Sequence, residues 1–241
     1  LADWRMSILQ AATLMSGYMV LFSELLSQFH ALNTLWVSIF WGLALAASIV
    51  LGWKKGWILE GFHSLRTGWR KPGWFDILAG TIVAMILVLL FVVAVKSPVN
   101  NNDALLYHMS RTMHWTQNQS FQHYATNYEH QLYNPILAEL IILQARLLTN
   151  SDQLANLVQW LALVGCIVGI SGISQLLGNG RMGRWISVAF ALSIPLAVLQ
   201  ATNPKNDLVT AFWLICLLFL LYNFYKHKIV VVKMVLELVL T

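Results

Sequence analysis

Charged residues are scarce in this sequence. Asp, Glu, Lys and Arg make up 10% of its 241 residues, whereas a soluble domain carries roughly 25%. So little charge excludes an ordinary water-soluble globular domain, and 58% of the residues are hydrophobic. Several apolar runs reach the roughly 20 residues that a helix needs to cross a bilayer. The sequence therefore predicts an all-α, polytopic transmembrane helical bundle.

Cysteine is rarer still, with two residues, and its placement argues against a disulfide or a cysteine metal site. Cys166 and Cys216 both lie inside apolar segments, where we interpret them as small hydrophobic residues. The net charge of +5 is not a nucleic-acid signal, because the basic residues cluster in short loops between apolar runs. In a membrane protein such loop charges set the orientation of the helices.

Six apolar runs are candidate spans, at residues 7–29, 35–52, 74–95, 154–177, 185–199 and 208–225. A basic connector at 53–73 follows the second run, and the positive-inside rule places it in the cytoplasm. It contains Lys54, Lys55, Arg66, Arg70 and Lys71. The third run then delivers the polar stretch 97–133 to the outer face. This divides the chain into an N-terminal transmembrane hairpin with its connector (1–73) and a second membrane region (74–241).

Residues 135–148 are apolar but short, which suits an interfacial helix better than a span. If this helix lies on the outer surface, the later basic turns fall on the cytoplasmic side, as the positive-inside rule favours. We therefore expect extracytoplasmic amphipathic surface helices beside the spans. The same topology places the loop 200–207 outside, so that Asp103 and Asp207 share one face.

Ionisable residues gather in the stretch 97–133, which holds four of the seven histidines. On a helical wheel of about 100° per residue, a polar stripe follows Asp103. Its members are Tyr107, Ser110, Arg111, His114 and Asn118. Another face gathers Leu105, Leu106, Met109 and Met113. The pattern predicts a short amphipathic helix with its apolar side on the membrane and its ionisable side toward something polar.

Each charged residue of the outer segments fits two interpretations. Asp103 and Asp207 both stand where a helix begins, so each is either an N-cap or a carboxylate available for chemistry. Arg111 and Lys205 are the only unambiguous cations in 97–133 and 200–207. They either snorkel at the interface or hold an anionic phosphate, which the planar guanidinium suits well. Glu24, inside the first run, is better explained as a helix contact.

A divalent metal site is a further hypothesis for the outer stretch. The histidines lack a compact metal-binding motif, and each by itself is a polar loop residue. Together, Glu129, His130 and His123 could close a metal site with Asp103 after folding. The loop tyrosines and Trp115 are either interfacial aromatics or platforms for a sugar ring.

The order of the predicted elements is similar to that of a known protein family. A span ends outside and an acidic residue opens an amphipathic helix, and a proline-initiated surface helix follows (YNPILAELIILQARLLTNSDQLANLVQW). A basic turn (LLGNGRMGR) precedes another span, and a short loop ends in Asp at the next one (ATNPKNDLVTAFWL). Over residues 74–225 this resembles the N-terminal portion of membrane-embedded C-type glycosyltransferases, specifically the protein mannosyltransferase and aminoarabinose transferase branch, which is glycosyltransferase family 39-like.

The resemblance implies an integral membrane enzyme of the bacterial inner membrane. Such enzymes transfer a sugar, with inversion, from a polyprenyl-phosphate carrier to a lipid, glycan or protein acceptor on the extracytoplasmic face. Asp103 matches the acidic residue of the family's first outer loop and Asp207 the acidic residue after its fourth core span, so we expect both to be catalytic. For substrate binding we expect Arg111, Lys205, Tyr107 and His114, and for a divalent metal Glu129 and His130. The family often has paired acids where this chain has Asp103 and Ala104.

Two other functions stay open at this point. A transporter or flippase of lipid-linked sugars would use the same phosphate and cations, but would place ionisable residues near the bilayer midplane. A non-catalytic membrane scaffold is the third hypothesis. Because the chain lacks a start methionine and its last segment stops at Thr241 in mid-pattern, we expect it to be a fragment of a longer protein.

Overall fold

The computed structural model describes residues 4–56 and 71–240, and every regular element in those ranges is helical. Five helices in these ranges are long and apolar enough to cross a bilayer. They are α1 (Trp4–Gln28), α2 (Thr34–Lys54), α4 (Trp74–Lys96), α8 (Leu157–Leu176) and α11 (Asp207–Leu240). The predicted all-α class and the prediction of an integral membrane protein are confirmed. Arg66 and Arg70 of the predicted connector lie outside the described residues.

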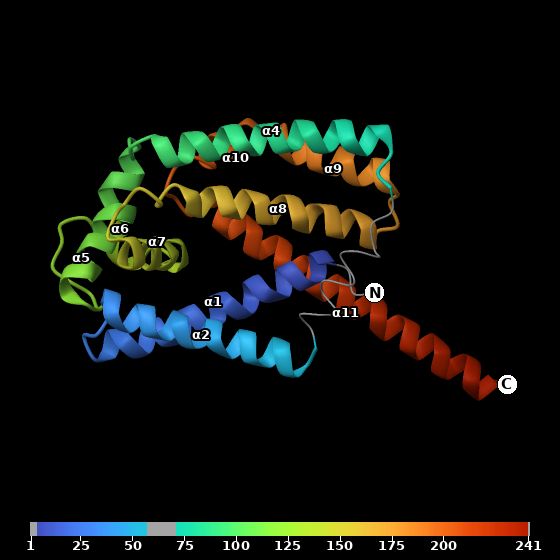
Figure 1. The fold of residues 1–241 in the computed structure, drawn as a ribbon, viewed down its shortest axis with the longest axis horizontal. Coiled ribbons are helices and arrows are strands. Elements are labelled where there is room, and N and C mark those ends of the chain that lie inside the picture. The colour runs from blue at the N-terminus through green and yellow to red at the C-terminus, as the bar shows by residue number, and fades with distance from the viewer. Residues whose placement is uncertain (1–3, 57–70, 241) are drawn as a thin grey trace.

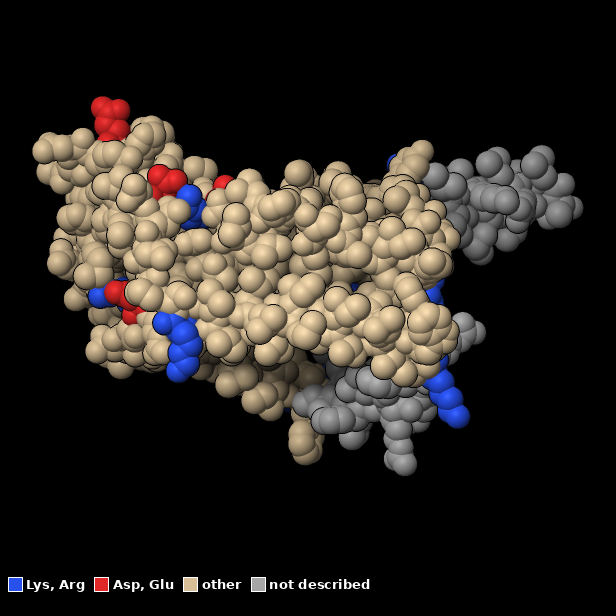
Figure 2. Space-filling view, turned by 90° about the horizontal axis from the view of Figure 1, so that it is seen from above, with Lys and Arg blue, Asp and Glu red and all other residues tan. Residues whose placement is uncertain are grey.

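The bundle has two distinct ends, which Figure 1 shows at its left and right. At the first, called the loop end, the side chain of Asn156 donates hydrogen bonds to the backbone oxygens of Ala94 and Ser97. At the second, called the basic end, Arg181 pairs with Asp76 at the start of α4, at 3.0 Å. Figure 2 shows charged atoms at both ends of one face and a broad uncharged middle, as expected of a protein that crosses a membrane.

The fifth predicted span, 185–199, is not one helix. It is divided into α9 (Arg181–Leu192) and α10 (Pro195–Gln200), and neither is long enough to cross alone. Pro195 has no backbone N–H and its ring disfavours a helical conformation before it, so α9 ends and α10 begins there. Arg181 lies at the basic end and Lys205 pairs with Asp103 at the loop end, so the two helices together still run the length of α4.

The helix α8 is the centre of the packing. Its glycines Gly165, Gly169 and Gly172 face α11 so closely that a Cβ on any of them would come closer than 3.0 Å to a side chain of that helix. Small residues of this kind let two membrane helices approach until their surfaces interlock. In contrast, α4 buries only 6% of its apolar span completely and exposes many large apolar side chains, which is typical of a helix that faces lipid.

Four short helices cover the loop end. They are η1 (Ala104–Met109, a π-helix), α5 (Ser110–Asn118), α6 (His130–Tyr133) and α7 (Leu137–Thr149). The helix α7 is the predicted interfacial segment, and it does not span the bundle, because α5 before it and the start of α8 after it both lie at the loop end. Whether this end faces the outside stays a prediction.

The burial of α7 differs from the expectation of a helix resting on a membrane surface. Seven of its 13 residues are buried. Gln144 accepts a hydrogen bond from the indole of Trp41 in α2 at 3.1 Å and donates one to Ser23 in α1 at 3.0 Å. The helix is therefore a packed layer between the N-terminal hairpin and α5, and it ties residues 4–56 to the rest of the fold.

Candidate functional site

Asp103 is exposed and does not cap its helix. Its carboxylate makes no capping hydrogen bond. Instead, the side-chain oxygen of Asn101 accepts from the backbone N–H groups of Asp103 and Ala104, at 3.0 and 3.5 Å. The N-cap interpretation of Asp103 is therefore wrong, because Asn101 already fills that position. The carboxylate of Asp103 is left available for other interactions.

Lys205 supplies the partner of that carboxylate. Its Nζ lies 2.9 Å from Oδ2 of Asp103, across 102 residues of sequence. The Lys205 side chain is only 12% exposed, whereas that of Asp103 is 51% exposed. The two outer segments that the sequence placed on one face thus meet directly. A partly buried ammonium beside an accessible carboxylate can hold a second anion as well as the first.

Asp207 lies at the first position of α11, and a buried amide positions it. The side-chain oxygen of Gln159 in α8 accepts from the backbone N–H groups of Leu208 and Val209, at 2.7 and 3.2 Å. These are the free donors that begin every helix, so Gln159 does the work of a cap from a neighbouring helix. Asp207 is exposed beside this junction.

Tyr107 marks the place where the acidic groups converge. Burial raises the pKa of its phenol, and the negative charges of Asp103, Glu139 and Asp207 raise it further. Its ring also lies near those of Tyr128 and His130, at 6.5 and 6.1 Å between centroids. A neutral, hydrogen-bonding aromatic surface therefore stands beside two exposed carboxylates and one cation.

Arg111, expected to hold phosphate, is completely buried. Its guanidinium donates to four backbone oxygens of the following loop and to Glu139. The four oxygens belong to His130, Gln131, Asn134 and Pro135. In this structure Arg111 does not reach solvent and cannot clamp a substrate phosphate. The polar partner that the amphipathic pattern predicted for it is the protein's own backbone.

A buried trio around Glu139 was not predicted as a site. Glu139 accepts from Arg111 at 3.1 Å and from Nδ1 of His108 at 2.9 Å, and all three side chains are 0% exposed. Burial lowers the pKa of Arg111, and the Glu139 carboxylate opposes that effect. The sequence did contain a signal for this cluster, because Glu139 is an acid inside the apolar run 135–148. A buried carboxylate requires a cationic or hydrogen-bonding partner.

The helical wheel grouped Arg111 with the exposed Asp103, but in the structure Arg111 faces inward. Residues 104–109 form a π-helix that continues into α5. The buried side of these two helices holds Ala104, His108, Arg111 and Trp115, three or four residues apart, and His108 and Arg111 meet Glu139 of α7 there. Leu105, Leu106 and Met113 stay exposed as expected of a membrane-facing side, but Met109 is buried.

The predicted metal ligands do not come together. Nδ1 of His130 lies 2.7 Å from the hydroxyl of Tyr133. No group of three His, Cys, Asp or Glu side chains positioned for a metal ion occurs within residues 4–56 and 71–240. His114, a predicted substrate ligand, stacks on Tyr124 with 4.1 Å between ring centroids. Among the described residues, the predicted ligands therefore do not form one cluster, and a divalent metal site stays a prediction.

Comparison of the chain with protein-family models, curated proteins and solved structures found no match.

Proposed function

We propose that this protein is a membrane glycosyltransferase that moves a sugar from a polyprenyl-phosphate carrier to an acceptor hydroxyl at the loop end. The observation that carries the proposal is the pairing of exposed Asp103 with Lys205, beside Asp207 and the ring of Tyr107. The reaction needs a base, a cation for the leaving phosphate and a surface for the sugar ring. The carboxylate, the ammonium and the aromatic ring supply these three groups.

In the proposed reaction the acceptor oxygen attacks the anomeric carbon as its proton passes to the carboxylate of Asp103. The bond between that carbon and the phosphate oxygen breaks, and the lipid phosphate leaves with the electron pair. Attack opposite to the leaving group inverts the anomeric centre. Lys205 stabilises the phosphate as its negative charge grows, and this contact releases Asp103 from the ion pair to act as base.

The other residues have supporting roles in this proposal. Asp207 orients the acceptor, and Tyr107 lies against a sugar ring. Arg111 acts as a positioning residue, because it holds the loop whose residues Tyr128 and His130 neighbour Tyr107. The proposed step uses the carboxylate of Asp103 and the ammonium of Lys205. The membrane's polar boundary at the loop end, where these groups lie, is the extracytoplasmic face in this proposal.

A transporter or flippase of lipid-linked sugars is the second candidate, and one observation favours it. An apolar groove of about 440 Å³ runs between α4 and α9, lined by residues such as Ile82, Ile86 and Ala189. It lies next to the break at Pro195, and interrupted helices are common in transporters. The groove is suited to a lipid chain. A transporter would carry ionisable residues near the middle of the membrane, whereas here they lie at the ends of the bundle. We therefore prefer the transferase to the transporter.

The test measures release of free polyprenyl phosphate by the full-length protein in lipid, supplied with a panel of polyprenyl-phosphate sugars. Asp103→Asn should reduce the rate at least about 100-fold, since a general base contributes 10²–10⁴. Asp207→Asn should reduce it less. The matched control is Asp152→Asn, because Asp152 is an exposed carboxylate paired with Arg146 at the same end.

The outcomes separate the candidates. Loss of release in Asp103→Asn, with wild-type release in Asp152→Asn, supports the transferase. Equal release in wild type and Asp103→Asn removes the proposed base. Carrier binding without release from any donor, together with movement of the carrier between leaflets, replaces the transferase with the flippase.

A further inference from the structure

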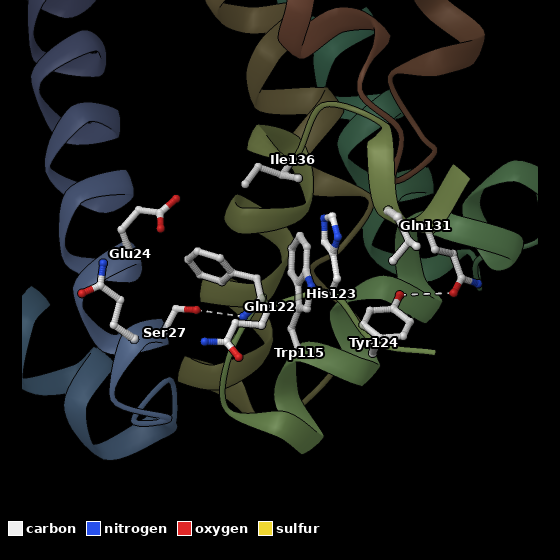
Figure 3. A pocket seen from close by; sticks show the side chains of 11 residues that line it. Glu24, Ser27, Trp115, Gln122, His123, Tyr124, Gln131 and Ile136 are labelled. Carbon is white, nitrogen blue, oxygen red and sulfur yellow. Dashed lines mark hydrogen bonds between the residues drawn. The ribbon is translucent and has the colours of Figure 1, made fainter. Parts of the chain in front are cut away.

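A pocket at the loop end is lined by neither Asp103 nor Asp207. It has a volume of about 290 Å³ and lies between α1 and the chain around residues 115–136 (Figure 3). Figure 3 places Glu24 and Ser27 of α1 on one side and His123, Tyr124 and Gln131 on the other. Small-molecule pockets span roughly 300–1,000 Å³, so this one suits a single small ring.

One set of lining groups is fixed and forms the wall. Ser27 Oγ lies 3.0 Å from Ser120 Oγ and accepts from the backbone N–H of Phe121 at 3.0 Å. The hydroxyl of Tyr124 donates to Oε1 of Gln131 at 3.2 Å. The ring of Trp115 packs edge-on against that of Phe121. These contacts preorganise an aromatic wall before any ligand arrives.

A second set is free to bind. The side chains of Glu24, Gln28, Gln122 and His123 are exposed and make no hydrogen bond to other described residues. Two amides, a carboxylate and an imidazole offer both donors and acceptors around the aromatic wall. Neither Lys nor Arg is among the described residues that line the pocket, so its chemistry does not suit a phosphate. Free donors and acceptors around apolar rings match a neutral, polyhydroxylated ring.

The wall of this pocket is connected to the candidate catalytic groups. Gln131 uses its amide nitrogen to donate to the backbone oxygen of Leu106 at 2.6 Å and to Ser110 Oγ at 2.9 Å. Leu106 belongs to the π-helix that follows Asp103. Tyr128, four residues after Tyr124, has its ring near that of Tyr107. The loop that forms the pocket wall therefore also reaches the candidate catalytic groups.

We infer that this pocket binds a neutral sugar unit of the acceptor, so that the acceptor of the proposed transferase is a saccharide chain. That the bound sugar is an acceptor rests on the proposed function. Binding of a sugar in the pocket does not depend on that function. Neither Lys205 nor any other described Lys or Arg lines the pocket, so the phosphate-linked donor does not belong in it. It also uses α1, which gives the N-terminal hairpin a role in choosing the acceptor.

Direct binding tests the inference without catalysis. The full-length protein in lipid nanodiscs is titrated with neutral oligosaccharides of one to four units, and with inorganic phosphate as the anionic probe. Calorimetry follows binding in wild type and in the double variant Gln28→Ala, Gln122→Ala. Removing two hydrogen-bonding amides should raise the Kd at least about tenfold. Gln117→Ala is the matched control, since Gln117 is an exposed amide on α5 outside the pocket.

Binding of a saccharide that weakens in the double variant and not in Gln117→Ala supports the inference. Equal binding in all three proteins, no binding of any saccharide, or competition by inorganic phosphate overturns it. The transfer assay separates this result from the proposed function. Polyprenyl phosphate release without saccharide binding leaves the transferase and removes the sugar pocket. Saccharide binding that depends on the two amides, without release from any donor, keeps the pocket and removes the transferase.

Discussion

Arg111 and Lys205 each pair with a carboxylate at the loop end, at 3.1 and 2.9 Å, but in different surroundings. Arg111 and Glu139 are fully buried, and Arg111 also donates to four backbone oxygens. The Lys205 pair opens to solvent through Asp103. A buried pair cannot exchange partners without leaving a charge in an apolar medium, whereas an exposed pair exchanges at little cost.

The buried cluster and the exposed cluster therefore have different roles. The buried cluster fixes the path of residues 130–135 and with it the rings around Tyr107. The exposed cluster keeps a carboxylate and an ammonium ready for a ligand. Damage to the first should therefore reduce stability, and damage to the second should reduce activity.

The largest expected loss of stability is that of Arg111→Met. The substitution leaves the buried Glu139 carboxylate without its cation and four loop carbonyl groups without their donor. Removing one partner of a buried ion pair costs about 3–5 kcal/mol. Denaturant titration in detergent micelles would measure the free energy of unfolding. Arg146→Met is the matched control, because Arg146 pairs with the exposed Asp152. A free energy of unfolding of Arg111→Met equal to that of wild type would contradict the stabilising role of the buried cluster.

A smaller loss is expected for His108→Leu. Glu139 then loses the hydrogen bond from Nδ1 but keeps the one from Arg111, so we expect a cost of about 1–3 kcal/mol. The same titration measures it, with His123→Leu as the control because His123 is exposed and makes no hydrogen bond to other described residues. A His108→Leu protein as stable as wild type would show that Arg111 alone is sufficient for Glu139.

The smallest effect on stability should be that of Asp103→Asn. Exposed ion pairs contribute about 0–1 kcal/mol, so the free energy of unfolding should stay near that of wild type. In the release assay the same variant should be the most impaired. If Asp103→Asn instead unfolded as readily as Arg111→Met, loss of release would reflect structure, and the catalytic assignment of Asp103 would no longer stand.

Sequence reasoning succeeded where composition or a single residue type decides the outcome. Long apolar runs predicted the five described helices of membrane-crossing length. In lipid the backbone N–H and C=O groups must pair with one another, and a helix achieves this within a single segment. It failed at Asp103, where Asn101 rather than the aspartate became the cap. It also failed at Arg111, because the inward partner of this side chain is Glu139 on another helix, 28 residues away, which a helical wheel does not contain.

By itself the sequence determined the membrane class, the helical fold and the gathering of polar residues between apolar segments, since hydrophobic run length and charge placement are local properties. Only the tertiary structure decided which charges meet. The contacts of Lys205 with Asp103 and of Arg111 with Glu139 join residues 102 and 28 positions apart, and the cap of α11 comes from Gln159 on another helix. Such pairings depend on how helices pack and on the phase of each turn, which one-dimensional spacing does not contain.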